Sequence, residues 1–196
     1  EMKNSTFEQN LPKQMNASLA TSYTSHNGQF EPATLLYGST PPAEGLSTTT
    51  ADMWKLMTAI TNSGNYETMQ LLHDETSQSM LQTQFRGHPN LPGVTHGFFE
   101  QLVGQQRAIV RDGSGFGTTS RLFYIPEERV GYIYFQNSEN EGLLQQFQAS
   151  FLQYFSQKHK KLGQPTPLTK KEAELLEGYY RSVQYEHNIL KVGTYF

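Results

Sequence analysis

The sequence predicts an α/β fold in which helices cover both faces of a mainly antiparallel sheet. Residues 107–137, RAIVRDGSGFGTTSRLFYIPEERVGYIYFQN, contain three consecutive strand-like runs joined by short turns. Two helical patterns flank these runs in the chain, at residues 49–62 and 139–158. Because a sheet that is apolar on both faces must be covered on both sides, we expect a three-layer domain.

The clearest hairpin joins residues 122–125 to residues 130–135 through the turn at 126–129. Side chains alternate along a strand, and both the odd-numbered and the even-numbered residues of these strands are apolar. An earlier strand through Ile109 and Val110 runs into a glycine-rich turn. This turn offers a place where a substrate could approach the backbone.

Two helices are predicted to cover this sheet. The first, at 49–62, has threonines 48–50 as candidate N-caps, and it is expected to stop at Asn62-Ser63-Gly64. The second has a wide apolar stripe with glutamines on its opposite face, formed by Leu143, Leu144, Phe147, Phe151, Tyr154 and Phe155. We interpret this stripe as sheet-packing core rather than as a ligand groove.

The remaining segments carry weaker patterns. Residues 1–46 are rich in Ser, Thr, Asn, Gly and Pro and are expected to form loops and short turns. Residues 66–72 and 75–81 are expected to form two short helices, the second capped by Asp74. Residues 95–102 are expected to form a strand.

We expect three parts along the chain. Residues 1–160 form the main domain, 161–168 a linker rich in Gly and Pro, and 169–196 the beginning of a small β-rich domain. Within the last part, residues 178–181 and 189–196 are β-prone. About 20 residues are too few for an independent β-domain, so this part is incomplete.

Composition excludes several classes of function. The net charge of -3 and a pI near 6.1 argue against a nucleic-acid partner, which needs clustered basic residues. The chain has no cysteine, which removes disulfides, thiolate catalysis and zinc–thiolate sites. Its six histidines lack ligand spacing, so neither a metal nor a cofactor is predicted. No long apolar run is present, so we expect no membrane contact from this segment.

Several segments match, in order, the motifs of one known family. They are Met2-Lys3-Asn4-Ser5-Thr6-Phe7 for "GMKNTSF", Pro42 to Thr48 followed by Asp52-Met53 for "PAGGLxST...DM", His96-Gly97-Phe98-Phe99 for "GxGF", Arg111 to Pro126 for "HxGxxxGFxSxxxxxP", and Asn137 for the final "N". The chain therefore resembles the C-terminal half of the serine β-lactamase and penicillin-binding-protein-like family. The resemblance implies a three-layer β-lactamase-like fold, incomplete here, plus the start of a small β-domain.

Two family motifs are absent from the sequence. Family chemistry needs a serine activated by a lysine one helical turn later, followed by a Tyr-x-Asn loop. The chain contains no Ser-x-x-Lys, and its start corresponds to a point beyond both motifs. We therefore expect an N-terminally truncated piece that is inactive alone, with the missing N-terminal half as a partner.

The surviving third motif supplies the candidate site residues. By resemblance, Arg111 occupies the position of the Lys or His that faces the substrate carboxylate, Asp112 the small-residue position and Gly113 the glycine. The backbone N–H of Ser114 would be one of two oxyanion-hole donors. Arg111 departs from the family pattern, because a guanidinium binds a carboxylate but cannot share protons. Without the family, Arg111 and Asp112 read as an exposed adjacent pair at a strand end.

Two hypotheses of different class remain. In the first, the chain is part of an active serine acyl-transfer hydrolase acting on a D-amino-acid-containing peptide, an ester or a β-lactam. In the second, it is a non-catalytic module that binds a cell-wall carboxylate or a protein partner. The resemblance implies an extracytoplasmic or envelope location in a bacterium. A phosphate loop or a nucleophilic Ser114 fits the 113–117 turn poorly, because no lysine and helix follow it.

Overall fold

The structure is a computed structural model that describes residues 1–34, 38–89, 91–104, 106–115, 117–159, 169–175, 178–181 and 189–192. The chain divides into two compact units, residues 1–155 and 156–196. No helix among the described residues is both long and apolar enough to cross a membrane.

The first unit is built around a four-stranded antiparallel sheet with the order β5-β6-β7-β8. Its strands are β5 (Phe99–Val103), β6 (Gln106–Gly115), β7 (Thr118–Ile125) and β8 (Val130–Gln136). The predicted hairpin is confirmed, with Ile125 opposite Val130. Each strand is joined to the next by a short turn, which fixes the register of the whole sheet.

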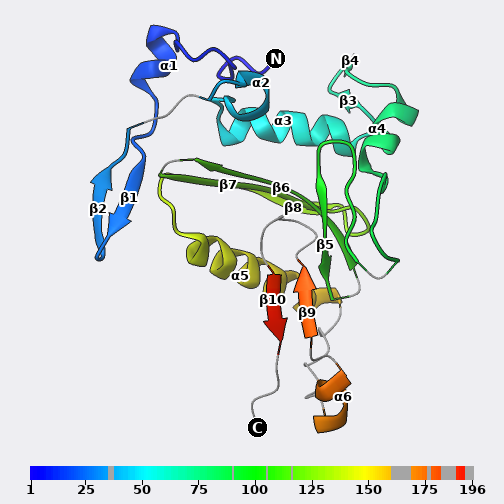
Figure 1. The fold of residues 1–196 in the computed structure, drawn as a ribbon. Coiled ribbons are helices and arrows are strands. Elements are labelled where there is room, and N and C mark those ends of the chain that lie inside the picture. Colours follow the sequence, from blue (N-terminus) through cyan, green and yellow to red (C-terminus); the bar gives the residue numbers. More distant parts are fainter. Residues whose placement is uncertain are drawn as a thin grey trace. The chain divides into compact units, whose positions relative to one another are not determined.

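Helices α3 (Thr50–Thr61) and α5 (Glu141–His159) lie on opposite faces of this sheet, as Figure 1 shows. Leu122 and Tyr124 pack with Met57 of α3. Phe123 packs on the other face against Phe151 of α5. The predicted three layers and the two apolar faces are therefore confirmed. Thr49 caps α3, since its side chain accepts a hydrogen bond from the Asp52 N–H.

Shorter elements surround the sheet. They are α1 (Lys13–Ala17), a hairpin of β1 (Tyr23–His26) and β2 (Gln29–Pro32), α2 (Pro41–Glu44), a hairpin of β3 (Asn65–Tyr66) and β4 (Met69–Gln70), and α4 (Asp74–Leu81). The segment expected to be only loops and turns therefore contains a β-hairpin and two short helices.

The helix expected at 66–72 is wrong, because this segment forms the β3–β4 hairpin. Gly64 and Glu67 have φ of +80° and +53°, a left-handed backbone that interrupts any helix. The helix at 75–81 is confirmed, but Asp74 is its first residue rather than its cap. The negative charge of Asp74 in the first turn still interacts favourably with the positive end of the helix dipole.

The strand expected at 95–102 begins only at Phe99. The preceding segment folds back, with Thr95 N–H donating to Phe98 O, and Gly97 has φ of +85°. Glu100 N–H donates to Gly93 O, away from β6. This reversal ends β5 early, and it leaves part of β6 without a neighbour.

The second unit contains α6 (Lys170–Leu175) and an antiparallel pair of β9 (Gly178–Arg181) with β10 (Ile189–Val192). Helix α6 was not expected. Thr169 and Glu172 form a capping box at its start, with Glu172 N–H donating to Thr169 Oγ1 and Thr169 N–H to Glu172. The predicted linker at 161–168 and the β-prone residues 193–196 lie outside the described residues.

Candidate functional site

Strand β6 has two halves with different environments. Residues 106–110 pair with β5, and Ile109 and Val110 also pair with β7; residues 108–110 are buried. Residues 111–115 pair only with β7 and are exposed. The last β5–β6 pair is Phe99 with Val110. Among the described residues, no other segment pairs with β6 beyond this point. The four predicted site residues all lie in the exposed half.

The peptide groups of Asp112 and Ser114 face this open edge. The Glu100 N–H donates to Gly93 O on the side away from β6. The peptide groups of the next pair, Phe99 and Val110, therefore face one another across β5 and β6. Because peptide groups alternate in direction along a strand, Asp112 and Ser114 face the same side as Val110. Of these three residues, strand β5 covers only Val110. The Ser114 N–H therefore lies on the open side.

Arg111 and Asp112 project to opposite faces of the sheet. Arg111 is opposite Leu122, whose side chain packs toward α3, whereas Asp112 is opposite Arg121. The guanidinium of Arg111 lies 6.0 Å from the centre of the Phe99 ring. Among the described residues no carboxylate forms an ion pair with Arg111. Its charge is thus available to a ligand on the α3 face.

Asp112 is held by Arg121 rather than by its neighbour Arg111. The Arg121 Nε and Nη2 atoms donate to the two Asp112 oxygens at 2.6 and 2.7 Å. This bidentate hydrogen bonding raises the pKa of Arg121. The Nη1 atom of Arg121 donates to Gln148 of α5, which also accepts from the Tyr132 hydroxyl. Asp112 is thereby turned to the α5 face, and it does not neutralise Arg111.

Gly113 lies between these residues and carries no side chain on the α3 face. It pairs with Ser120, whose hydroxyl donates to Gly113 O at 3.3 Å. A Cβ at Gly113 would meet Ser120 Oγ at 2.5 Å. Because Gly113 has no side chain, a ligand beside Arg111 can approach the backbone of β6 on this face.

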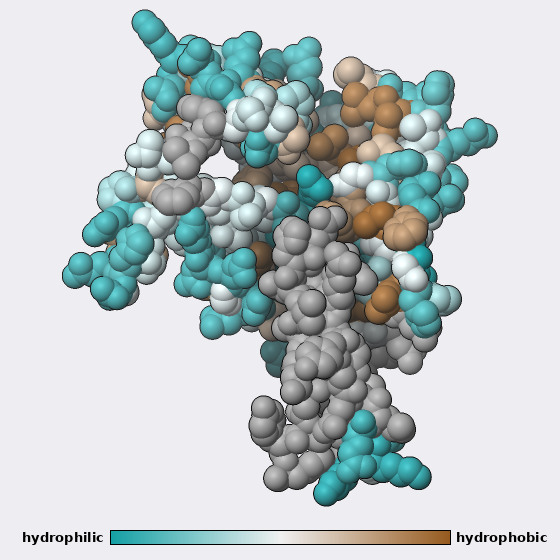
Figure 2. All heavy atoms as spheres, in the orientation of Figure 1, coloured by the Kyte–Doolittle hydropathy of each residue, from teal (hydrophilic) through white to brown (hydrophobic). Residues whose placement is uncertain are grey.

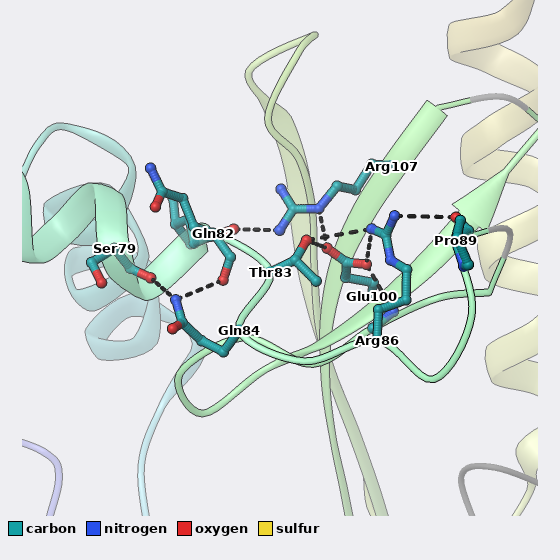
Figure 3. A network of polar contacts seen from close by, with 10 residues as sticks. Ser79, Gln82, Thr83, Gln84, Arg86, Pro89, Glu100 and Arg107 are labelled. Atoms are coloured by element: carbon teal, nitrogen blue, oxygen red, sulfur yellow. Dashed lines mark hydrogen bonds and ion pairs between the residues drawn. The ribbon is translucent and has the colours of Figure 1, made fainter.

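A second polar centre, which the sequence reasoning missed, lies beside the buried half of β6. Glu100 is 1% exposed and binds Arg86, Arg107 and Thr83, as Figure 3 shows. It also accepts a hydrogen bond from the Gly93 N–H. Burial alone would raise the pKa of Glu100, but hydrogen bonds from Thr83, Arg107 and Arg86 lower it to about 2.

This cluster fixes the segment that leads into β5. Arg86 and Gly93 belong to the chain before the strand, whereas Arg107 lies on β6 and also donates to Leu81 O. In the sequence, the available signal for this cluster was a glutamate, Glu100, followed within one hairpin by an arginine, Arg107. All carboxylate oxygens are satisfied, so the cluster is structural, and it holds Phe99 beside Arg111.

No group of three or more His, Cys, Asp or Glu side chains suited to a metal occurs in the described part of the chain. The polar groups near β6 are instead a cation, a backbone donor edge and a paired carboxylate. This arrangement can bind an anionic, extended ligand along the strand. No hydrogen bond that the structure describes at residues 111–115 pairs a nucleophilic side chain with a general base.

A sequence model of the Beta-lactamase family matches residues 1–152. The chain therefore belongs to the Beta-lactamase family, with the serine-hydrolase type of fold that this family has. A comparison with curated proteins gives no significant match.

Solved structures with a similar fold include three from microbial sources. The octameric penicillin-binding protein homologue from Pyrococcus abyssi has a TM-score of 0.61 and 18% identity, covering 98% of this chain and 43% of its own. A class C β-lactamase from Rhodobacter sphaeroides has a TM-score of 0.58 and 12% identity, covering 71% and 46%. A D-alanine carboxypeptidase from Burkholderia cenocepacia has a TM-score of 0.56 and 18% identity, covering 70% and 46%. The chain spans less than half the length of each of these structures.

Proposed function

We propose that this chain is the C-terminal portion of a serine acyl-transfer hydrolase and supplies the substrate-binding edge of its active site. The observation that carries the proposal is the open edge of β6 at residues 111–115, beside an Arg111 that forms no ion pair with a carboxylate in the described part of the chain. Membership of the Beta-lactamase family supports it. Residues 1–160 would form the hydrolase portion, 161–168 a linker and 169–196 the beginning of a further β-rich domain.

In this proposal each β6 residue has a separate role. The substrate lies along the open edge, where strand backbone groups accept an extended ligand. Arg111 binds the substrate carboxylate, and Gly113 leaves room for it. The Ser114 N–H donates to the carbonyl oxygen as negative charge develops on it. Asp112, bound to Arg121, keeps its own negative charge away from that carboxylate.

The nucleophile and its base would come from a Ser-x-x-Lys segment outside this chain. The serine hydroxyl attacks the substrate carbonyl as the lysine amine accepts its proton, the leaving group departs protonated, and water hydrolyses the acyl-enzyme. This chain alone is therefore expected to be inactive. Candidate substrates are a D-amino-acid-containing peptide, an ester or a β-lactam, and the proposed location is the cell envelope.

One observation favours a second candidate, a binding module without catalysis. Arginine cannot give up its proton, so Arg111 cannot share protons with a catalytic lysine or tyrosine. If this substitution marks loss of turnover, the site binds a carboxylate ligand and releases it unchanged.

The first test is an intact mass measurement on the full-length protein after incubation with a fluorophosphonate probe. A labelled serine in that protein, with none in the 196-residue chain, supports the hydrolase proposal. An unlabelled full-length protein contradicts it.

Arg111→Lys and Arg111→His in the full-length protein separate the two candidates. Both variants restore a residue that can exchange a proton, so ester turnover rises if the site is catalytic. Unchanged turnover with retained ligand binding favours the binding module. Arg129→Lys, in the turn at the other end of β7, is the matched control for the loss of a guanidinium.

A further inference from the structure

The turn that follows Ser114 is held by residues from two distant parts of the chain. Strand β6 ends at Gly115, which pairs with Thr118 of β7, and Gly117 precedes that residue with φ of +75°. The Gly117 N–H donates to the Glu139 carboxylate at 2.9 Å. The Gly117 carbonyl accepts from the Tyr23 N–H at 3.3 Å. The N–H and the carbonyl group of Gly117 are therefore both hydrogen-bonded.

Gly117 has no room for a side chain at this contact. A Cβ there would lie 2.8 Å from Tyr23 N and 3.0 Å from the Cβ atoms of both Ser22 and Ala33. These three residues form the base of the β1–β2 hairpin, where Ala33 N–H donates to Ser22 O. The hairpin base thus packs directly against the turn.

Residues 137–139, called here the backing segment, join the turn to the hairpin. Asn137 O accepts from Tyr23 N–H at 3.0 Å, and Asn137 Nδ2 donates to Thr21 O at 2.8 Å. Ser138 O accepts from the Thr119 hydroxyl at 3.0 Å. Thr119 is buried and lies opposite Ser114 in the β6–β7 register. The segment therefore holds the turn at Gly117 and the β7 residue that lies opposite Ser114.

The rest of the hairpin takes no part in this contact. All four residues of β2 are exposed, and the hairpin surface is mainly hydrophilic in Figure 2. Ser22, by contrast, is only 5% exposed. Because the base of the hairpin packs against the turn and β2 is exposed, we infer that the base is the part of the hairpin that stabilises the fold.

We propose that Glu139 is a positioning residue for the Ser114 N–H, acting through Gly117 with the base of the β1–β2 hairpin as the second support. This inference rests on the proposed function, in which that N–H binds the developing oxyanion. An oxyanion donor works only at a fixed distance and angle, so the turn next to it must not move. A carboxylate is the strongest acceptor for a backbone N–H among side chains.

The test uses Glu139→Ala, Glu139→Gln and the control Glu141→Ala in the full-length protein, with p-nitrophenyl butyrate as substrate. Glu141 carries the same charge two residues later in the first turn of α5. Glu139→Ala should lower kcat about tenfold with little change in KM, as expected for a displaced oxyanion donor. Glu139→Gln keeps an acceptor oxygen and should recover most of kcat, and Glu141→Ala should match the wild type.

Equal kcat values for Glu139→Ala and Glu141→Ala in an active enzyme would overturn the positioning role. A wild type without turnover would instead contradict the proposed function. Hydrogen exchange of the amides of Gly115 and residues 117–119 in the 196-residue chain provides a readout that needs no activity. Glu139→Ala should speed this exchange about tenfold and Glu141→Ala should not, and equal exchange in the two variants would overturn the proposal.

Discussion

The two halves of β6 show how one strand can serve both the core and a site. Residues 106–110 all pair with β5, and Ile109 and Val110 are paired on both edges and buried. The ionised group beside this half, Glu100, has its hydrogen bonds made within the fold. Residues 111–115 are paired on one edge only, and Arg111 beside them has no carboxylate partner among the described residues. The unsatisfied groups lie where a ligand could reach them.

Substitution of Glu100 and of Asp112, the two carboxylates next to β6, should give the largest difference in the free energy of unfolding. Glu100→Gln leaves Arg86 and Arg107 without their buried anion and should lower the free energy of unfolding by about 4 kcal/mol. Asp112→Asn removes a partner that is 48% exposed and should cost about 1 kcal/mol or less. Urea denaturation at pH 7 measures both values, and equal losses would contradict the comparison.

Acid should weaken the wild type through Glu100. The folded-state pKa of Glu100, about 2, lies below its ordinary value of 4.5. Its contribution to stability is therefore complete above about pH 4.5 and is lost as the pH falls toward 2. Glu100→Gln should lack this part of the acid dependence. Unfolding free energies measured at pH 5, 4 and 3 test this, and parallel curves for the two proteins would refute it.

Truncating a side chain to alanine should destabilise the protein more in the buried half of β6 than in the exposed half. Ile109 is 1% exposed, and it lines the space between the sheet and Met57 and Ile60 of α3. Ile109→Ala should cost about 3 kcal/mol, because it leaves a cavity. Arg111→Ala should change stability by less than about 0.5 kcal/mol while it abolishes carboxylate binding. Thermal unfolding of both variants measures the difference.

Gly113, in the exposed half of β6, and Gly117, in the buried turn that follows it, should respond differently to substitution. Gly117→Ala places a Cβ against the backbone of the hairpin base at a positive φ, and it should cost about 2 kcal/mol or more. Gly113→Ala meets only the Ser120 hydroxyl, which can rotate away, and should cost less than about 1 kcal/mol. If both variants unfold at the same urea concentration, the hairpin base does not support the turn.

The smallest expected effect is a stabilisation at the turn between β7 and β8. Arg129 has φ of +53°, a conformation that glycine adopts at lower cost. Arg129→Gly should therefore raise the free energy of unfolding by about 0.5 to 1 kcal/mol. A lower unfolding midpoint in this variant would show that its side chain makes a contact worth more than the strain.

The sequence predicted those features that depend on local patterns. Alternation in 122–125 and 130–135 and the helical spacing in 49–62 gave the three layers, because each pattern reports on neighbouring residues. The same spacing failed at 66–72, where left-handed residues turn the chain into a hairpin. The threonine and glutamate of the α6 capping box were a local signal that went unused.

The sequence could predict which residues form the candidate site, but not how they are arranged in space. Motif order placed residues 111–114 together, and they remain candidates. The early end of β5, which opens the edge, follows from a reversal at Gly97 and from contacts to Glu100. Contacts such as Asn137 with Thr21 join residues 116 positions apart, and no local pattern announces them.

The most direct test of the account is an NMR titration of the 196-residue chain with N-acetyl-D-alanyl-D-alanine, following the backbone amides of β6. We predict shift changes at residues 111–115, none at 106–110, and their loss in Arg111→Ala. Shift changes elsewhere with none at 111–115, or unchanged binding in Arg111→Ala, would contradict the claim that the open half of β6 is the ligand-binding edge.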